Sequence, residues 1–110
     1  MEKIYNKLVR DKIPQIIEND NKKPITRILG DEEYKSELEK KLLEEYKEVL
    51  STKTSDERIE ELADMYEIIC CLAELENKNI CDVCDVAKNK KLKRGGFEKK
   101  IFLEKVLDNE

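Results

Sequence analysis

The chain has 110 residues, of which 44% are charged, and its 26 acidic residues outnumber its 22 basic residues to give a net charge of −4. A chain of this length predicts a single domain over 1–110, and its acidic balance gives no reason to expect nucleic-acid binding. The absence of histidine excludes Ser-His-Asp and Cys-His catalysis and histidine-ligated metal sites. Any chemistry therefore uses carboxylates, Lys, Arg, Cys, Tyr or a metal ion.

No apolar run is long enough to cross a bilayer, and the opening MEKIYNKLVRDK alternates charged with apolar residues instead of forming a signal-peptide core. We therefore expect a cytoplasmic protein without a membrane partner. The four cysteines (Cys70, Cys71, Cys81 and Cys84) are then expected to be reduced. Structural zinc is an alternative, but adjacent residues on a helix project about 100° apart, and this spacing of Cys70 and Cys71 disfavours it.

The first third of the chain predicts one short helix and an irregular segment. Asp11-Lys12-Ile13-Pro14 is typical of a helix start with proline near the first position. That helix should fade at 19–21, where Asn and Asp cluster. The stretch from Pro24 to Leu29 predicts extended or irregular chain, and Gly30 ends it.

Three longer helices are predicted beyond Gly30. The first runs from Asp31, as N-cap, to about Leu50, and the second runs from Ser55, as N-cap with an incomplete capping box, to about Glu76. The third runs from about Ile80 to Lys93 and is stopped by Gly95-Gly96. The tail FEKKIFLEKVL fits either a strand or a helix, and we favour a last short helix.

The second long helix is apolar on nearly every face, and a buried helix has this pattern. A chain of 110 residues is too short to cover such a helix alone. The sequence therefore predicts an all-α fold, an antiparallel helical bundle completed by oligomerisation, with a homodimer or a higher homo-oligomer as the assembly.

Two acidic residues interrupt the apolar faces of that helix. Glu61 and Asp64 fall among apolar residues on a helical wheel, so both should point into protein. An ionised carboxylate without a partner in that setting costs several kcal/mol, and two at i and i+3 repel each other. A cation is therefore expected beside them. A salt bridge to Lys or Arg is the simpler alternative to a metal.

The preceding helix carries carboxylates that can face this pair. Glu45 lies close to the apolar arc of its helix, and Glu48 lies on the same shoulder. A short loop makes the two helices antiparallel neighbours, so four carboxylates can converge on a site suited to Mg²⁺. Alternatively, the glutamates of the first helix are solvated surface charges paired with Lys41 or Lys47.

These residues resemble a known signature. Glu44-Glu45-Tyr46-Lys47-Glu48 followed by Glu61-Leu62-Ala63-Asp64 resembles the EExxE…ExxD motif of the all-α MazG-like NTP pyrophosphohydrolases, a superfamily that includes phosphoribosyl-ATP pyrophosphohydrolase and dimeric dUTPases. Asn89 to Arg94 resembles the N-x-K-F-x-R segment, with Leu92 in place of Phe. The opening YNKLVRDKIP and the closing RGGFEKKIFLEKV resemble a small branch of predicted house-cleaning enzymes.

The resemblance implies a function and a set of residue roles. It implies Mg²⁺-dependent hydrolysis of a nucleoside triphosphate to the monophosphate and pyrophosphate, with the metal held by Glu45, Glu48, Glu61 and Asp64. Glu44 or Glu48 would accept the proton of the attacking water. Substrate contacts fall to Asn89, Lys91 and Arg94. Arg10 and Lys12 are further candidates for phosphate contact, with plain surface charge as the alternative. On the wheel, Lys91 and Arg94 extend an apolar face, so their stems should lie inward, whereas Asn89 lies on another face.

Two other functions stay open at the level of sequence. One is phosphoribosyl-ATP pyrophosphohydrolase of histidine biosynthesis, which shares the signature. The other is a non-catalytic helical interaction module, although the intact set of four carboxylates disfavours a decayed site. The sequence does not indicate which nucleotide base the enzyme would prefer.

Overall fold

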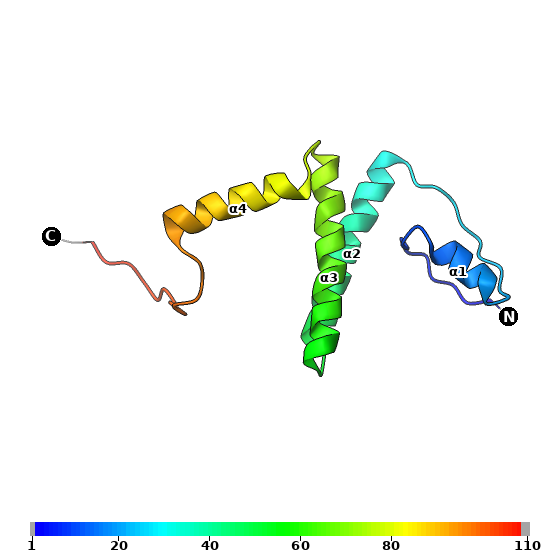
Figure 1. The fold of residues 1–110 in the computed structure, drawn as a ribbon, viewed down its shortest axis with the longest axis horizontal. Helices are drawn as coiled ribbons and strands as arrows, with labels where there is room; N and C mark the ends of the chain where they lie inside the picture. The colour runs from blue at the N-terminus through cyan, green and yellow to red at the C-terminus, as the bar shows by residue number, and fades with distance from the viewer. Residues whose placement is uncertain (1, 109–110) are drawn as a thin grey trace.

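The structure is a computed structural model and describes residues 2–108. Four α-helices follow in order: α1 (Ile13–Asn19), α2 (Asp31–Ser51), α3 (Ser55–Leu75) and α4 (Ile80–Arg94) (Figure 1). No strand occurs within this described range, so the predicted all-α class is confirmed, and the four helices begin and end close to the predicted positions. None of the described helices is long and apolar enough to cross a membrane.

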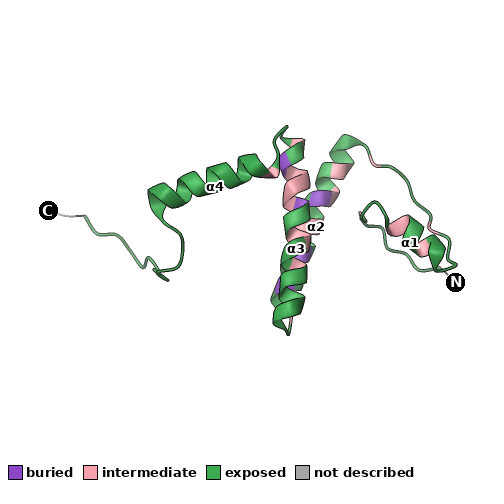
Figure 2. Ribbon diagram, viewed as in Figure 1, coloured by how far each residue is buried: buried purple, intermediate pink, exposed green. Residues whose placement is uncertain are grey.

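The core lies between α2 and α3, which form an antiparallel hairpin around a loop at 52–54 (Figure 1). Leu38 and Val49 of α2 and Ile68 and Ala73 of α3 are the buried apolar residues, and Leu38 is only 2% exposed. Figure 2 places all the buried positions on these two helices. Burying a large aliphatic side chain contributes about 1.5–3 kcal/mol, so this small seam holds the hairpin together.

The start of α3 is fixed by a side-chain cap one residue earlier than predicted. Thr54, not Ser55, is the N-cap, and its hydroxyl oxygen accepts a hydrogen bond of 3.1 Å from the backbone N–H of Glu57. The Glu57 carboxylate in turn accepts 2.9 Å from the N–H of Lys53. With the cap at Thr54, the acid that the capping box wants three residues later is present as Glu57, whereas counting from Ser55 had found Arg58.

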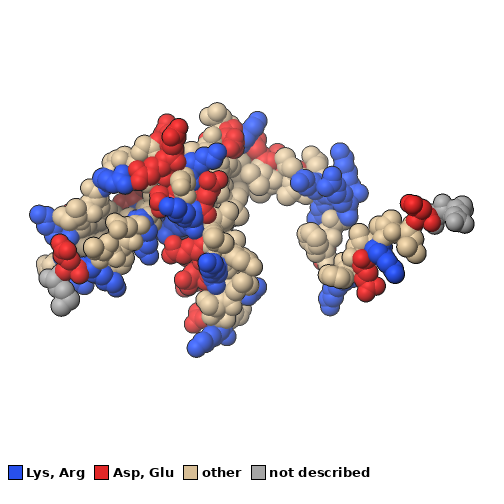
Figure 3. All heavy atoms as spheres, turned by 180° about the vertical axis from the view of Figure 1, so that it is seen from behind, with Lys and Arg blue, Asp and Glu red and all other residues tan. Residues whose placement is uncertain are grey.

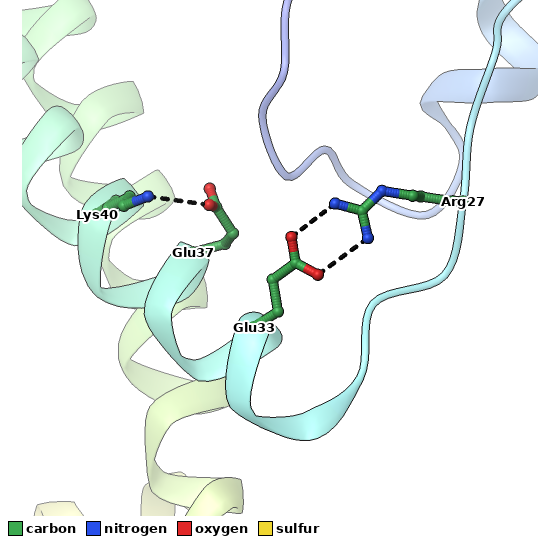
Figure 4. A network of polar contacts seen from close by, with 4 residues as sticks. All are labelled: Arg27, Glu33, Glu37 and Lys40. Carbon is green, nitrogen blue, oxygen red and sulfur yellow. Dashed lines mark hydrogen bonds and ion pairs between the residues drawn. The ribbon is translucent and has the colours of Figure 1, made fainter.

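The start of α2 also differs from the prediction. Gly30 is the N-cap with an extended backbone, and Asp31 is the first helical residue, where its charge meets the positive end of the helix dipole. The preceding segment is tied to this turn by Arg27, whose guanidinium donates hydrogen bonds of 2.9 and 2.6 Å to the two carboxylate oxygens of Glu33 (Figure 4). These bonds hold the pKa of Glu33 below its usual value.

The turn between α3 and α4, which falls in the gap between the two predicted helices, is closed by local polar contacts. Asn77 has a left-handed backbone (φ 58°), and the N–H of Lys78 donates to the carbonyl of Ala73 at 3.1 Å, which is the Schellman arrangement. Asn79 then caps α4 in a full capping box with Asp82. These contacts let α4 start in a new direction, with no packing against α2.

The tail after α4 is not the short helix that we favoured. Gly95 takes φ 82° and ends α4, a single turn follows in which the N–H of Lys100 donates to the carbonyl of Phe97 at 3.0 Å, and 101–108 are irregular. An isolated helix of this length is marginal unless it buries an apolar face. The apolar side chains of the tail, including Phe102, are exposed, so no element of the described chain stabilises a helix here.

The chain is open. We call residues 80–108 the arm, and in Figure 1 the arm leads away from the hairpin. The radius of gyration is 19.4 Å and the extents are 71 × 36 × 23 Å, whereas a compact chain of this length has a radius of roughly 13 Å. The accessible surface is 10735 Å², compared with roughly 6,300 Å² for a compact monomer of this mass.

Candidate metal centre

Three carboxylates meet where α2 and α3 face each other. Glu45 of α2 and Glu61 and Asp64 of α3 each offer an oxygen that lies within 4.8 Å of the other two. The i, i+3 spacing places Glu61 and Asp64 on one side of α3, and the antiparallel pairing sets Glu45 opposite them. The structure thus brings together three of the four predicted metal ligands. Glu48, the fourth, has an exposed side chain outside this group.

The three carboxylates differ in burial. Glu45 is 9% exposed and is the only charged residue buried in the described range. Glu61 is partly exposed, and 40% of the Asp64 side-chain surface is exposed to solvent. Glu61 and Asp64 therefore face Glu45 across the hairpin, but they are buried only in part, less than expected. Much of the apolar surface around them, such as Leu62, is also exposed, because no other element covers this side of α3.

Two cations lie beside the carboxylates. Arg10, from the segment before α1, donates a hydrogen bond of 2.7 Å from Nη2 to Oδ1 of Asp64. The Lys41 ammonium lies 3.9 Å from Oε1 of Glu45, one turn away on α2. The sequence had offered Arg10 as a phosphate ligand and Lys41 as a simple surface partner of the glutamates. A helical wheel could not reveal the Arg10 contact, because it joins residues 54 positions apart.

Burial and the neighbouring carboxylates raise the pKa of Glu45. Burial raises the pKa of Glu45 to about 7, and a hydrogen bond to Glu61 and the charges of Asp64 and Glu61 act in the same direction, opposed by Lys41. A carboxyl group with such a pKa carries a proton part of the time at neutral pH. The centre therefore holds more negative charge than its two cations neutralise, and a proton makes up part of the difference.

The remaining predicted site residues lie away from this centre or on the surface. Glu44 and Lys12 are exposed. Asn89, Lys91 and Arg94 are all exposed on the arm, so the expected inward direction of the Lys91 and Arg94 stems is wrong for the single chain. Lys91 forms an exposed ion pair of 3.5 Å with Glu98. The arm of the same chain contributes nothing to the carboxylate centre, because α4 has no contact with α2 and only a small contact with α3.

The cysteines do not form a metal site of their own in the described range. All four are free, and none joins a group of metal-binding side chains. Burial raises the pKa of the Cys71 thiol, although a hydrogen bond with Tyr34 lowers it, and burial together with this hydrogen bond raises the pKa of Tyr34 to about 12. Both groups are therefore protonated at neutral pH, and a thiol is a poorer zinc ligand than a thiolate.

Comparison with known proteins adds one partial relative. No known protein family and no solved structure matches the chain. A protein of Mycolicibacterium smegmatis, described only as uncharacterized, is 42% identical over 53 residues. That stretch covers 48% of this chain and 54% of the relative, so the chain spans about half the length of the protein it matches. This similarity assigns neither a family nor an activity.

Proposed function

We propose that the chain is a MazG-like nucleoside triphosphate pyrophosphohydrolase that uses Mg²⁺ to release the monophosphate and pyrophosphate. The observation that carries the proposal is the meeting of Glu45, Glu61 and Asp64 within 4.8 Å. These residues belong to the two halves of the EExxE…ExxD signature, which lie apart in the sequence. The reaction itself rests on the resemblance of that signature.

The donor set suits a hard divalent cation. Three carboxylates offer oxygen ligands only, and Mg²⁺ takes oxygen ligands and keeps positions for water and substrate phosphates. Burial, the hydrogen bond to Glu61 and the charges of Asp64 and Glu61 raise the pKa of Glu45, and a divalent cation beside it would favour the ionised carboxylate. Glu45, Glu61 and Asp64 would hold the ion. Glu48, one turn beyond Glu45, would have to turn its exposed side chain toward them to join.

Each side chain then has a defined task. Bound Mg²⁺ supplies charge neutralisation at the phosphate oxygens and lowers the pKa of a coordinated water. Glu44 or Glu48, both exposed near the centre, would accept the proton from the water that attacks the α-phosphorus. Arg10 would exchange its bond to Asp64 for a phosphate oxygen, because a guanidinium pairs equally well with phosphate. Lys12 is a second cation in the same segment.

Pyrophosphate release in the presence of Mg²⁺, assayed across nucleoside triphosphates and phosphoribosyl-ATP, tests the proposal. Glu61→Gln should reduce turnover by more than about 100-fold, since even a residue that only supports a metal ligand contributes about 10–100-fold. Glu60→Gln is the matched control, because Glu60 is the preceding residue and is exposed outside the centre, and it should retain activity. Orthophosphate as the first product, or equal activity in both variants, would contradict the proposal.

The ion pairs support a second candidate, a non-catalytic helical interaction module. Arg10–Asp64 and Lys41–Glu45 satisfy two of the three carboxylates without any metal, as a structural cluster would. Such a cluster predicts no pyrophosphate from any nucleotide. It also predicts that Arg10→Ala destabilises the chain with or without Mg²⁺, and thermal melting in the two conditions measures this.

A further inference from the structure

Two ion pairs attach the N-terminal segment, residues 2–29, to the hairpin. Arg27 bonds Glu33 at the start of α2. Arg10 bonds Asp64 in the middle of α3. Among the described residues, no other hydrogen bond or ion pair joins the segment to the hairpin, and α1 does not pack against α2 or α3 (Figure 1). The Arg10 bond is therefore the main polar attachment of the part of the segment that precedes Arg27.

The two attachments use carboxylates of different kinds. Glu33 lies outside the carboxylate centre, whereas Asp64 is one of its three members. The Arg10 guanidinium takes Oδ1 of Asp64 at 2.7 Å. A divalent cation held by the same carboxylate would repel this guanidinium at short range. Arg10 and the cation therefore compete for Asp64, while the Arg27 attachment is unaffected.

A count of charges identifies the cation that would leave. Three ionised carboxylates carry three negative charges, which a divalent cation and the Lys41 ammonium match without Arg10. Lys41 is fixed on α2 and only 21% of its side chain is exposed. Arg10 lies in irregular chain, and 56% of its side chain is exposed. Because an exposed ion pair contributes little to stability, Arg10 is the cation that a metal would displace.

Charges outside the centre attract the segment to the hairpin when no metal is bound. Residues 2–29 carry seven basic and four acidic residues, a net charge of +3. Residues 31–76, which form the hairpin, carry sixteen acidic and six basic residues, a net charge of −10. Figure 3 shows acidic side chains over the hairpin, with basic ones among them. A divalent cation at the centre would offset two of these negative charges and weaken the attraction.

We propose that Arg10 fastens the N-terminal segment to the metal-free carboxylate centre and that a divalent cation bound there detaches it. By linkage, the attached Arg10 lowers the affinity of the centre for the cation by the same factor by which the cation weakens the attachment. Once released, Arg10 is free to meet a phosphate oxygen. The identity of the cation as Mg²⁺ rests on the proposed function, but the attachment through Arg10 does not.

Nuclear magnetic resonance of the ¹⁵N-labelled chain tests the detachment without nucleotide. The heteronuclear ¹H–¹⁵N NOE reports backbone motion at each amide on the picosecond to nanosecond scale. In chelator, residues 8–12 should be ordered, and in saturating Mg²⁺ they should become flexible. The amides beside Arg27 are the internal control and should not change, because their attachment to Glu33 lies outside the centre. Shifts of the hairpin amides in the same titration report Mg²⁺ binding independently of the segment.

Arg10→Gln and Arg27→Gln are the matched variants, since each removes one positive charge and one exposed ion pair from the same segment. In Arg10→Gln, residues 8–12 should be flexible even in chelator. This variant should also bind Mg²⁺ about two- to fivefold more tightly than the wild type, a factor that corresponds to the loss of one exposed ion pair. Arg27→Gln should bind Mg²⁺ as the wild type does. Isothermal titration calorimetry measures the affinities.

The possible failures point to different causes. Mg²⁺ binding that leaves residues 8–12 ordered, or equal Mg²⁺ affinity in the two variants, would overturn the proposal and leave the pyrophosphohydrolase function standing. Residues 8–12 that are already flexible in wild-type protein in chelator would overturn it as well. Hairpin amides that do not respond to Mg²⁺ would overturn both the detachment and the proposed metal site, because Arg10 would then have no competitor.

Discussion

The hairpin and the arm carry large apolar side chains in similar proportion but bury them to different extents. Every buried residue of the described chain lies on α2 or α3 (Figure 2). All the large apolar side chains of the arm except the partly exposed Ile80 are exposed. The difference is the presence of a neighbouring element, because an apolar side chain contributes to stability only when another surface removes it from water. The hairpin finds its partner within the chain, and the arm does not.

The residues at the helix ends show the opposite contrast, because they favour α4 over α2. α4 has the better helix ends, with a full capping box at Asn79 and Asp82 and three basic residues in its last turn, where they complement the helix dipole. α2 has no side-chain cap and no basic residue in its last turn. The comparison teaches that α4 is specified by its own sequence, whereas α2 depends on packing against α3.

The largest effect is expected in the hairpin seam. Ile68→Ala should lower the free energy of unfolding by about 2–5 kcal/mol, because it removes three methyl or methylene groups from the small core. Leu92→Ala in the arm, where the side chain is 85% exposed, should change it by no more than about 0.5 kcal/mol in dilute protein. Urea unfolding monitored by circular dichroism measures both. Equal losses in dilute protein would mean that the arm belongs to the core of one chain.

The carboxylate centre should make the metal-free hairpin sensitive to pH. The pKa of Glu45 is raised from 4.5 to about 7 in the folded chain, so the folded state binds this proton more tightly than the unfolded state. The resulting stability is fully present below pH 4.5 and is lost as the pH rises through 7. Urea unfolding in chelator should therefore show a lower free energy of unfolding at pH 8 than at pH 5, and Glu45→Gln should reduce the difference. A wild-type free energy that rises over this window would contradict the repulsion.

The smallest effect concerns the start of α3. Thr54→Ala removes the side-chain acceptor of the Glu57 N–H and should cost about 1 kcal/mol of unfolding free energy. Ser55→Ala is the control, because Ser55 is the first helical residue and its side chain makes no hydrogen bond among the described residues. It should be nearly neutral. A larger loss of unfolding free energy in Ser55→Ala than in Thr54→Ala would mean that Ser55 is the N-cap, as the sequence alone had suggested.

The sequence predicted the helices well because their signals are local. Apolar periodicity and the Asn and Gly residues at the turns located α3, the start of α4 and its end at Gly95. Cap positions were missed by one residue at Thr54 and at Gly30, because neighbouring residues of similar propensity compete for the same role. The tail fits either a strand or a helix in sequence, and a short helix there would form only if a surface were available to cover its apolar side chains.

The candidate site was predicted in part for the same reason. Glu45, Glu61 and Asp64 come together because helical spacing and an antiparallel hairpin fix their positions. The Arg10–Asp64 contact was not predicted, since it joins segments far apart in the chain. The burial of Asp64 was overestimated, because a helical wheel shows which faces are apolar but not whether anything covers them. Lys91 and Arg94 lie where the helix pattern puts them, and their place relative to the centre depends on packing that the single chain lacks.

If the carboxylates of the hairpin bind a divalent cation, the cation should stabilise the folded chain. Thermal melting with chelator and with Mg²⁺, in the wild type, Glu60→Gln and Asp64→Asn, tests it directly. Mg²⁺ well above its dissociation constant should raise the melting temperature of the wild type and of Glu60→Gln by about 4 °C or more and leave Asp64→Asn nearly unchanged. Without metal, Asp64→Asn should melt within a few degrees of the wild type, because it loses an exposed ion pair with Arg10 worth about 0–1 kcal/mol and relieves repulsion on Glu45. An equal Mg²⁺ response in all three proteins, or an Asp64→Asn variant that melts far below the others in chelator, would show that the cluster is a structural ion-pair network and not a metal site.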